Sequence, residues 1–249
     1  MDLKDKVVII TGAGSGIGKA TALNLASQGA IIVCADYNES TAKNTADLIS
    51  ENKGKASFVK ADVSKAAEVE NMVEFAAKTH GTLNGIFNNA GIGDVKPLLE
   101  HDPETYLRVV NVNQHGVYYG IYYAAKKMVQ LGTNGVIVNT ASIYAYSVSI
   151  GSINYHAAKA AVVAMTKAAA LELATYNIRV VGVAPGFIAT PILGDNQEFL
   201  NKLANQHMRR NLIQPEQVAS VVAFLFSNDA EAINGQVIPV DDGFLSFKE

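Results

Sequence analysis

Short apolar runs alternate with longer stretches of helical spacing along the chain, and this alternation restricts the possible folds more than any other feature. None of the apolar runs alternates apolar with polar residues. Such runs are typical of strands covered on both faces, as in a parallel sheet. The expected strands are residues 7–10, 31–35, 56–59, 85–87, 136–138, 178–183 and 237–240. The expected helices are residues 18–28, 40–52, 66–79, 103–131, 154–176 and 215–226.

Strand followed by helix, repeated in that order, predicts an α/β fold: a Rossmann-type, doubly wound parallel sheet with helices on both faces. No composition break, low-complexity tract or internal repeat divides the chain, so residues 1–249 are expected to form a single domain. One segment, at about residues 190–214, departs from this alternation of strands and helices. It follows a strand and combines polar residues with a short amphipathic piece, and we expect it to be a lid rather than a disordered linker.

Composition narrows the class of protein. Hydrophobic residues make up 49% and charged residues 17% of the chain, which excludes disorder. The net charge of −3 gives no electrostatic reason to bind nucleic acid or an anionic membrane. The single cysteine excludes an internal disulfide, and we find neither a secretory signal nor a membrane-spanning stretch. We therefore expect a cytoplasmic protein without membrane partners.

A glycine-rich turn directly follows the first expected strand and opens the first helix. Four glycines fall between Gly12 and Gly18. Glycine allows the tight turn and leaves room for a pyrophosphate, while the helix N-terminus offers unpaired N–H groups to the phosphates. A merely flexible loop is the alternative, but the position between strand and helix favours a dinucleotide site. Its expected contacts are Gly12, Ser15, Gly16, Ile17 and Gly18.

An acidic residue, Asp36, ends the second expected strand 18 residues after Gly18. A carboxylate at this point can accept hydrogen bonds from ribose hydroxyls and would repel a 2′-phosphate, so it favours NAD over NADP. The alternative is an Asp that only starts a turn with Asn38. No Arg or Lys follows directly, since Tyr37 and Asn38 stand there.

Tyr155 and Lys159 are spaced i and i+4 near the start of an expected helix, so both project from one face. A free tyrosine has a pKa of about 10, and a neighbouring ammonium lowers it by favouring the phenolate. The pair is therefore a candidate proton donor and acceptor, although this spacing also occurs by chance.

These motifs, taken with several others in the same order, resemble the short-chain dehydrogenase/reductase family over essentially the full length. The matching pieces are 11–18, Asp62-Val63, 88–91, Val112-Asn113 with Gly116, Ser142, Tyr155 with Lys159, Pro185-Gly186 with Thr190, and Gly235-Gln236.

The resemblance implies a catalytic tetrad of Ser142, Tyr155, Lys159 and Asn113 that interconverts an alcohol and a ketone. Tyr155 would exchange the proton with the substrate oxygen, and Ser142 would orient that oxygen. Lys159 would hold the nicotinamide ribose and lower the pKa of Tyr155, while Asn113 would fix a water that relays the proton.

The resemblance also implies further contacts to NAD. Asp62 and Val63 would frame the adenine, whereas Asn88 would brace its strand. The other implied contacts are Asn89, Ala90 and Gly91 at the adenosine ribose, Pro185 and Gly186 in the following loop, and Ile188 and Thr190 at the carboxamide, besides Tyr155 and Lys159.

Other reactive residues are set aside. The five histidines show no metal-ligand spacing, so we expect no metal, and Cys34 lies in an apolar run that suits an inert core thiol. Tyr118 and Tyr122 belong to a group of tyrosines crowded on one helix, where packing against another subunit is the favoured interpretation. Because family members commonly assemble through this helix and the next, we expect a homotetramer.

The predicted function is an NAD-dependent interconversion of a small secondary alcohol and a ketone. The expected substrate pocket is mostly apolar: Gly93, Tyr144, Tyr146, Ser149, Phe187, Ile192, Leu193, Phe199 and Met208.

The first alternative is a 3-oxoacyl carrier-protein reductase. Asp36 disfavours the NADP that such enzymes typically use, and Tyr176 stands where they typically carry an Arg. A more distant alternative is a non-catalytic NAD sensor, although sensors usually lose the Tyr and Lys that this chain keeps. Asp241-Asp242-Gly243 departs from the usual Asp-Gly-Gly of the family, and we expect this difference to lie near the lid or a subunit contact.

Overall fold

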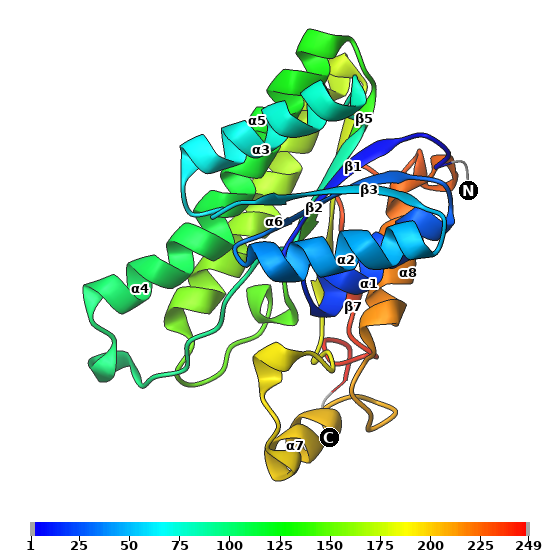
Figure 1. The fold of residues 1–249 in the computed structure, drawn as a ribbon. Coiled ribbons are helices and arrows are strands. Elements are labelled where there is room, and N and C mark those ends of the chain that lie inside the picture. Colours follow the sequence, from blue (N-terminus) through cyan, green and yellow to red (C-terminus); the bar gives the residue numbers. More distant parts are fainter. Residues whose placement is uncertain (1–2, 248–249) are drawn as a thin grey trace.

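A seven-stranded parallel sheet forms the centre of the computed structural model, which describes residues 3–247 (Figure 1). The strand order is β3-β2-β1-β4-β5-β6-β7, and every neighbouring pair is parallel. The predicted fold class is therefore confirmed. The strands are β1 Val7–Thr11, β2 Ile31–Asp36, β3 Lys55–Lys60, β4 Gly85–Asn88, β5 Gly135–Thr140, β6 Ile178–Pro185 and β7 Val237–Val240.

Three helices cover each face of the sheet (Figure 1). On one face, apolar residues of α1, α2 and α8 pack together against the strands, and on the other face those of α3, α5 and α6 do so. Burial on both faces explains why the strands read as continuous apolar runs. The helices are α1 Gly16–Ser27, α2 Glu39–Glu51, α3 Ala66–His80, α4 Pro103–Val110, α5 Gly116–Leu131, α6 Ile153–Leu173, α7 Gln197–Ala204 and α8 Pro215–Phe226.

The stretch predicted as one helix over residues 103–131 is divided in the structure. A π-helical turn, Asn111–His115, joins α4 to α5. Within this turn Asn113 is fully buried, and its side chain bonds to the backbone of Ile92 in the loop after β4. A π-turn adds one residue to a helical turn, and such turns are frequent at functional sites.

The strand order reverses between β1 and β4, and this reversal locates the crevice where ligands bind in open α/β sheets. The carboxyl ends of β1, β4, β5 and β6 all lie at this edge of the sheet. The segment at 190–214, which follows β6, folds as a short 3-10 turn and the helix α7. None of the helices within residues 3–247 is long and apolar enough to cross a membrane.

Candidate functional site

The turn between β1 and α1 has the shape that a dinucleotide phosphate needs. Gly12 and Gly16 adopt φ values of +66° and +49°, which L-residues rarely tolerate. A Cβ on Gly12 would lie 3.0 Å from Nδ2 of Asn89, so the neighbouring loop leaves no room for a side chain. Among the described residues, no side chain caps the start of α1 at Ser15. Its first N–H groups therefore suit the phosphates of a dinucleotide.

Asp36 lies beside this turn, at the end of β2. One carboxylate oxygen accepts a hydrogen bond from the Gly14 N–H at 2.9 Å, and the other accepts one from the Asn38 N–H at 2.9 Å. A Cβ on Gly14 would lie 2.9 Å from the Asp36 carboxylate. The interpretation as a turn residue and the interpretation as a ribose ligand are thus compatible, because the same bonds that close the turn fix the carboxylate beside the glycine loop.

Thr11 connects β1 with the loop after β4, a role that the sequence reasoning did not assign. Its hydroxyl donates to the carbonyl of Phe87 at 3.3 Å and accepts from the N–H groups of Asn89 and Ala90, at 2.9 and 3.1 Å. The amide of Asn89 donates in turn to the Thr11 carbonyl at 3.0 Å. Asn89 and Ala90, predicted to line the adenosine ribose, are therefore held against the glycine turn.

The predicted adenine residues lie between β3 and α3. Asp62 accepts hydrogen bonds from the backbone and hydroxyl of Ser64, at 3.0 and 2.6 Å. Burial opposes ionisation of Asp62, but the bonds from Ser64 and the charge of Lys65 outweigh it and lower its pKa. Val63 packs against Gly116 at the start of α5, and Gly91 lies against the amide of Asn113.

The residues of the predicted tetrad come from three elements at the same edge of the sheet. Ser142 follows β5, Tyr155 and Lys159 lie in the first turns of α6, and Asn113 lies in the π-turn. Lys159 is only 2% exposed, and its Nζ donates to the carbonyl of Thr140 at 2.7 Å. The same Nζ lies 5.6 Å from the centre of the Tyr155 ring.

Burial changes the proton affinities of both Lys159 and Tyr155. It lowers the pKa of Lys159 from 10.5 to about 8. Burial raises the pKa of Tyr155, and the hydrogen bond with Ser142 opposes that rise. The protein alone therefore favours the neutral phenol, which differs from the expectation that Lys159 lowers the pKa of Tyr155.

The amide of Asn113 is largely occupied by protein partners. Its Oδ1 accepts from the Ile92 N–H at 2.9 Å, and its Nδ2 donates to the Ile92 carbonyl at 2.7 Å. The side chain thus joins the π-turn to the loop after β4, and one donor hydrogen and one lone pair stay available for a water.

Three of the predicted pocket residues meet in one apolar cluster. Phe187 is buried there with Ile143, and Tyr144 and Leu193 pack against them. Tyr144 lies edge-on to Tyr155, with ring centres 6.4 Å apart. The other predicted pocket residues are more exposed and lie outside this cluster: Gly93, Tyr146, Ser149, Ile192, Phe199 and Met208.

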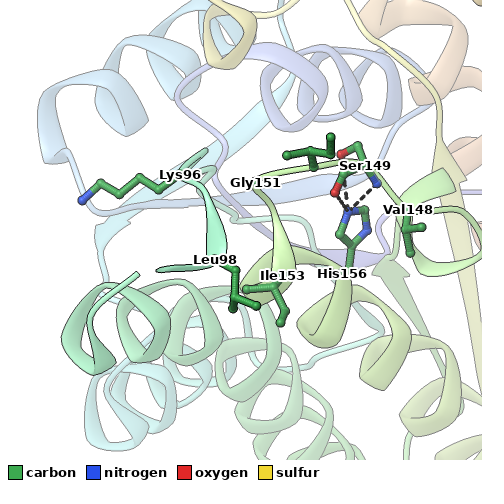
Figure 2. A pocket seen from close by; sticks show the side chains of 8 residues that line it. Lys96, Leu98, Val148, Ser149, Gly151, Ile153 and His156 are labelled. Atoms are coloured by element: carbon green, nitrogen blue, oxygen red, sulfur yellow. Dashed lines mark hydrogen bonds between the residues drawn. The ribbon is translucent and has the colours of Figure 1, made fainter. Parts of the chain in front are cut away.

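Ser149 lines a separate cavity of about 330 Å³ between the loop after β4 and the segment before α6 (Figure 2). His156, which the sequence reasoning set aside, accepts there from the Ser149 N–H at 3.0 Å and bonds through Nδ1 to the Tyr144 carbonyl at 2.9 Å. This histidine therefore ties the segment that carries Tyr144 to α6, next to Tyr155. Other lining residues are Lys96, Leu98, Val148 and Ile153.

The loop after β6 brings the last predicted cofactor residues to the site. Pro185 ends the strand, and Gly186 donates its N–H to the Val240 carbonyl at 3.0 Å. Ile188 forms a parallel bridge with Ile213, so the end of the segment 190–214 lies beside the loop where the segment begins. Thr190 lies over the glycine turn, since a Cβ on Gly16 would be 2.9 Å from its methyl group.

Neither a metal site nor a reactive thiol stands out in this part of the chain. Within residues 3–247, no group of three or more His, Cys, Asp or Glu side chains is placed to hold a metal ion. Cys34 is buried in β2, and burial raises the pKa of its thiol to about 12.

Comparison with known proteins relates this chain to a family of oxidoreductases. A family model described as enoyl-(acyl carrier protein) reductase matches residues 12–245. Cyclohexanol dehydrogenase from an Acinetobacter strain is 44% identical over 97% of this chain and 96% of its own. A 3-oxoacyl-(acyl-carrier-protein) reductase from Thermotoga maritima is 36% identical over 98% of this chain and 100% of its own. The crystal structure of a short-chain type dehydrogenase/reductase from Mycobacterium marinum superposes with a TM-score of 0.95 at 31% identity, covering 99% of this chain and 98% of that one.

Proposed function

Because this chain belongs to the short-chain dehydrogenase/reductase family, we propose that it is an NAD-dependent oxidoreductase that interconverts a secondary alcohol and a ketone. The family uses NAD or NADP, and the relatives include alcohol dehydrogenases and ketone reductases. The observation that carries the proposal is that Ser142, Tyr155 and Lys159 meet at the same edge of the sheet as a glycine turn that fits a dinucleotide.

Bound NAD would supply the hydride acceptor for oxidation of the alcohol, and bound NADH the hydride donor for reduction of the ketone. The glycine turn and the start of α1 would hold the pyrophosphate, and Asp36 would accept hydrogen bonds from the adenosine ribose. Neither Tyr37 nor Asn38 carries a cation that would favour a 2′-phosphate. The choice of NAD over NADP rests on this arrangement.

Tyr155 takes the proton from the substrate hydroxyl in oxidation and gives it to the carbonyl oxygen in reduction. Ser142 donates a hydrogen bond to the same oxygen and so orients it. Lys159, buried beside Tyr155, stabilises negative charge on the phenolate more strongly than an exposed cation would, because little water screens it. Asn113, held by Ile92, would complete the proton path by fixing a water.

The substrate is proposed to be a small cyclic or secondary alcohol of low polarity. Tyr144, Phe187 and Leu193 offer apolar surface, and a relative at 44% identity is a cyclohexanol dehydrogenase. A panel of cyclic and linear secondary alcohols with NAD, read at the absorbance of NADH, tests this proposal. Turnover of cyclohexanol or a close analogue is expected, whereas inactivity across the whole panel would overturn it.

A 3-oxoacyl carrier-protein reductase is the second candidate, favoured by the relative from Thermotoga maritima. Tyr176, which follows α6 and is 53% exposed, provides no cation for an acidic carrier protein at this point. Reduction of acetoacetyl-coenzyme A with NADPH, at a higher catalytic efficiency than any alcohol with NAD, would favour this second candidate. We further propose a cytoplasmic location, which fractionation of the native cells would test.

A further inference from the structure

The most deeply buried histidine of the chain, His207, has no place in the proposed chemistry. It follows the lid helix α7 and is 1% exposed. Its Nε2 faces the backbone N–H of Phe187 at 3.2 Å, and its Nδ1 faces the carbonyl of Asn211 at 2.7 Å. Because a backbone N–H can only donate and a carbonyl can only accept, the ring satisfies both partners only as the neutral tautomer with its hydrogen on Nδ1.

The chain makes room for this ring at the start of the loop after β6. A Cβ on Gly186 would lie 2.7 Å from Nε2 of His207, so a larger residue at position 186 would displace the imidazole. The ring centre of His207 also lies 5.6 Å from that of Phe187. The imidazole is thus packed against the segment that it holds by a hydrogen bond.

Phe187 transmits this contact toward the site through aromatic rings. Its ring meets Tyr144 edge-on at 5.9 Å, and Tyr144 meets Tyr155 edge-on at 6.4 Å. On the other side, Phe187 packs against Phe244 at 5.5 Å. Edge-to-face pairs at these distances are favourable and directional, so a displacement of Phe187 changes the position of Tyr144.

A second contact fixes the residues directly after His207. The backbone carbonyl of Asp242 accepts a hydrogen bond from the Met208 N–H at 3.0 Å. The Asp242 carboxylate accepts two more, from the backbone N–H and the Nε of Arg209, at 2.8 and 2.6 Å. His207 therefore lies between two fixed points, Phe187 on one side and the turn at Asp242 on the other.

We propose that His207 is a positioning residue, which accepts the Phe187 N–H and thereby fixes the apolar pocket wall formed by Phe187 and Tyr144 for the substrate. This inference rests on the proposed alcohol–ketone chemistry only for its effect on kinetics. Its structural part, the hydrogen bond from the Phe187 N–H to Nε2, can be measured independently.

Two variants separate the roles of the two ring nitrogens. His207→Gln places an acceptor near the position of Nε2, whereas His207→Asn reaches only the position of Nδ1 and keeps a donor for Asn211. Hydrogen–deuterium exchange, resolved to the single amide of Phe187 by electron-transfer fragmentation, is the first measurement. The Asn variant is expected to exchange this amide roughly tenfold faster than the wild type, and the Gln variant less than about threefold faster.

Steady-state kinetics with NAD and cyclohexanol are the second measurement. The Asn variant is expected to raise KM for cyclohexanol roughly tenfold, while kcat and the KM for NAD change less than about twofold and the Gln variant restores KM. Phe187→Ala, which removes the wall but keeps the amide, should raise the same KM. It serves as the test of the wall should the Asn variant fail to fold.

Three outcomes would overturn the proposal. The first is equal protection of the Phe187 amide in the Gln and Asn variants. The second is a fall in kcat of the Asn variant with its KM for cyclohexanol unchanged. The third is an unchanged KM for cyclohexanol in Phe187→Ala. If wild-type protein does not oxidise cyclohexanol, that substrate assignment fails, but the exchange measurement still decides whether His207 holds Phe187.

Discussion

At the scale of single residues, we propose that Asp36 sets the preference for NAD over NADP at the end of β2. Its carboxylate is fixed by the N–H groups of Gly14 and Asn38 and would face the position where NADP carries its extra phosphate. Two negative groups at such a distance repel each other, and partial burial strengthens the repulsion.

We predict that Asp36→Asn narrows the preference for NADH over NADPH. The amide keeps an oxygen acceptor for the turn but removes the charge, so the ratio of the two dissociation constants should fall by roughly tenfold, which corresponds to about 1.4 kcal/mol. Titration of protein fluorescence with each cofactor measures the ratio. Asp47→Asn removes the same charge from the exposed face of α2, where Asp47 pairs with Lys43, and should leave the ratio unchanged. Wild-type protein that binds NADPH more tightly would contradict the account.

Lys159 is the residue whose burial has the clearest consequence for stability. The pKa of Lys159 is about 8 in the folded chain, whereas an exposed lysine, as in the unfolded chain, has a pKa of 10.5. Between these values the unfolded chain binds more protons than the folded chain, so stability increases with pH across this window. Below about pH 8 both states are protonated, and the folded state carries the full cost of a buried charge.

We predict that wild-type protein gains stability relative to Lys159→Met by about 2 kcal/mol between about pH 8 and pH 10. Met has a similar length and no charge, so other titrating groups cancel in the comparison. Urea unfolding of both proteins without cofactor, repeated across this pH range, measures the difference. Parallel stability curves would show that the Lys159 ammonium is not destabilised by burial.

At the scale of elements, the segment 190–214, proposed to be a lid, is held by a turn near the C-terminus. Asp242 adopts φ +46°, which is unfavourable for a residue with a Cβ, yet it holds Met208 and Arg209 through three hydrogen bonds. The bonds from Arg209 lower the pKa of the Asp242 carboxyl. The departure from the family pattern noted at this position thus lies at the base of the lid.

Substitutions of Asp242 separate the backbone strain from the side-chain bonds. Asp242→Gly removes both, whereas Asp242→Ala removes the bonds and keeps the strain, so we expect the Ala variant to lose about 2 kcal/mol and the Gly variant about 1 kcal/mol less than that. Asp242→Asn, which tolerates this backbone conformation, should be the mildest change. Thermal unfolding and the rate of proteolysis within 190–214 measure the effects. If the Ala variant were as stable as the Gly variant, the positive φ at position 242 would not destabilise the folded chain.

The elements show where sequence reasoning succeeds and where it stops. The strand and helix order follows from apolar patterning, which is local, and α8 and β7 begin and end at the residues predicted. The π-turn at Asn113 depends on Ile92, 21 residues earlier, and the burial of His207 depends on Phe187, 20 residues earlier. Contacts of this kind leave no periodic signal in the sequence. Histidines at 156 and 207 therefore looked unremarkable, although both hold backbone near the site.

At the scale of the whole molecule, the face formed by α4, α5 and α6 has exposed apolar side chains. Tyr118 and Tyr122 on α5 are 50% and 47% exposed, and Leu171 on α6 is 81% exposed. We predict a homotetramer that covers this face, with four times the chain mass of 26.4 kDa in light scattering after size exclusion. Tyr122→Asp should lower that mass. A wild-type monomer of 26.4 kDa would contradict the prediction.

The sheet brings residues from Gly12 to Tyr155 together at the carboxyl edge of β1, β4 and β5. The family membership explains the reaction class, whereas we propose that the substrate is selected by the pocket wall and the segment 190–214, whose contacts come from distant parts of the chain. We propose that proton transfer at this edge takes place through Tyr155 while NAD is bound beside it.

Replacement of Tyr155 by Phe tests this proposal, with Tyr176→Phe, an exposed tyrosine after α6 that belongs to neither the tetrad nor the expected substrate pocket, as the matched control. Turnover of the best alcohol in the panel and the dissociation constant of NADH are measured for both variants. We predict that Tyr155→Phe lowers turnover by roughly a thousandfold and changes NADH binding less than about threefold, while the control keeps both. Undiminished turnover by Tyr155→Phe would contradict the account.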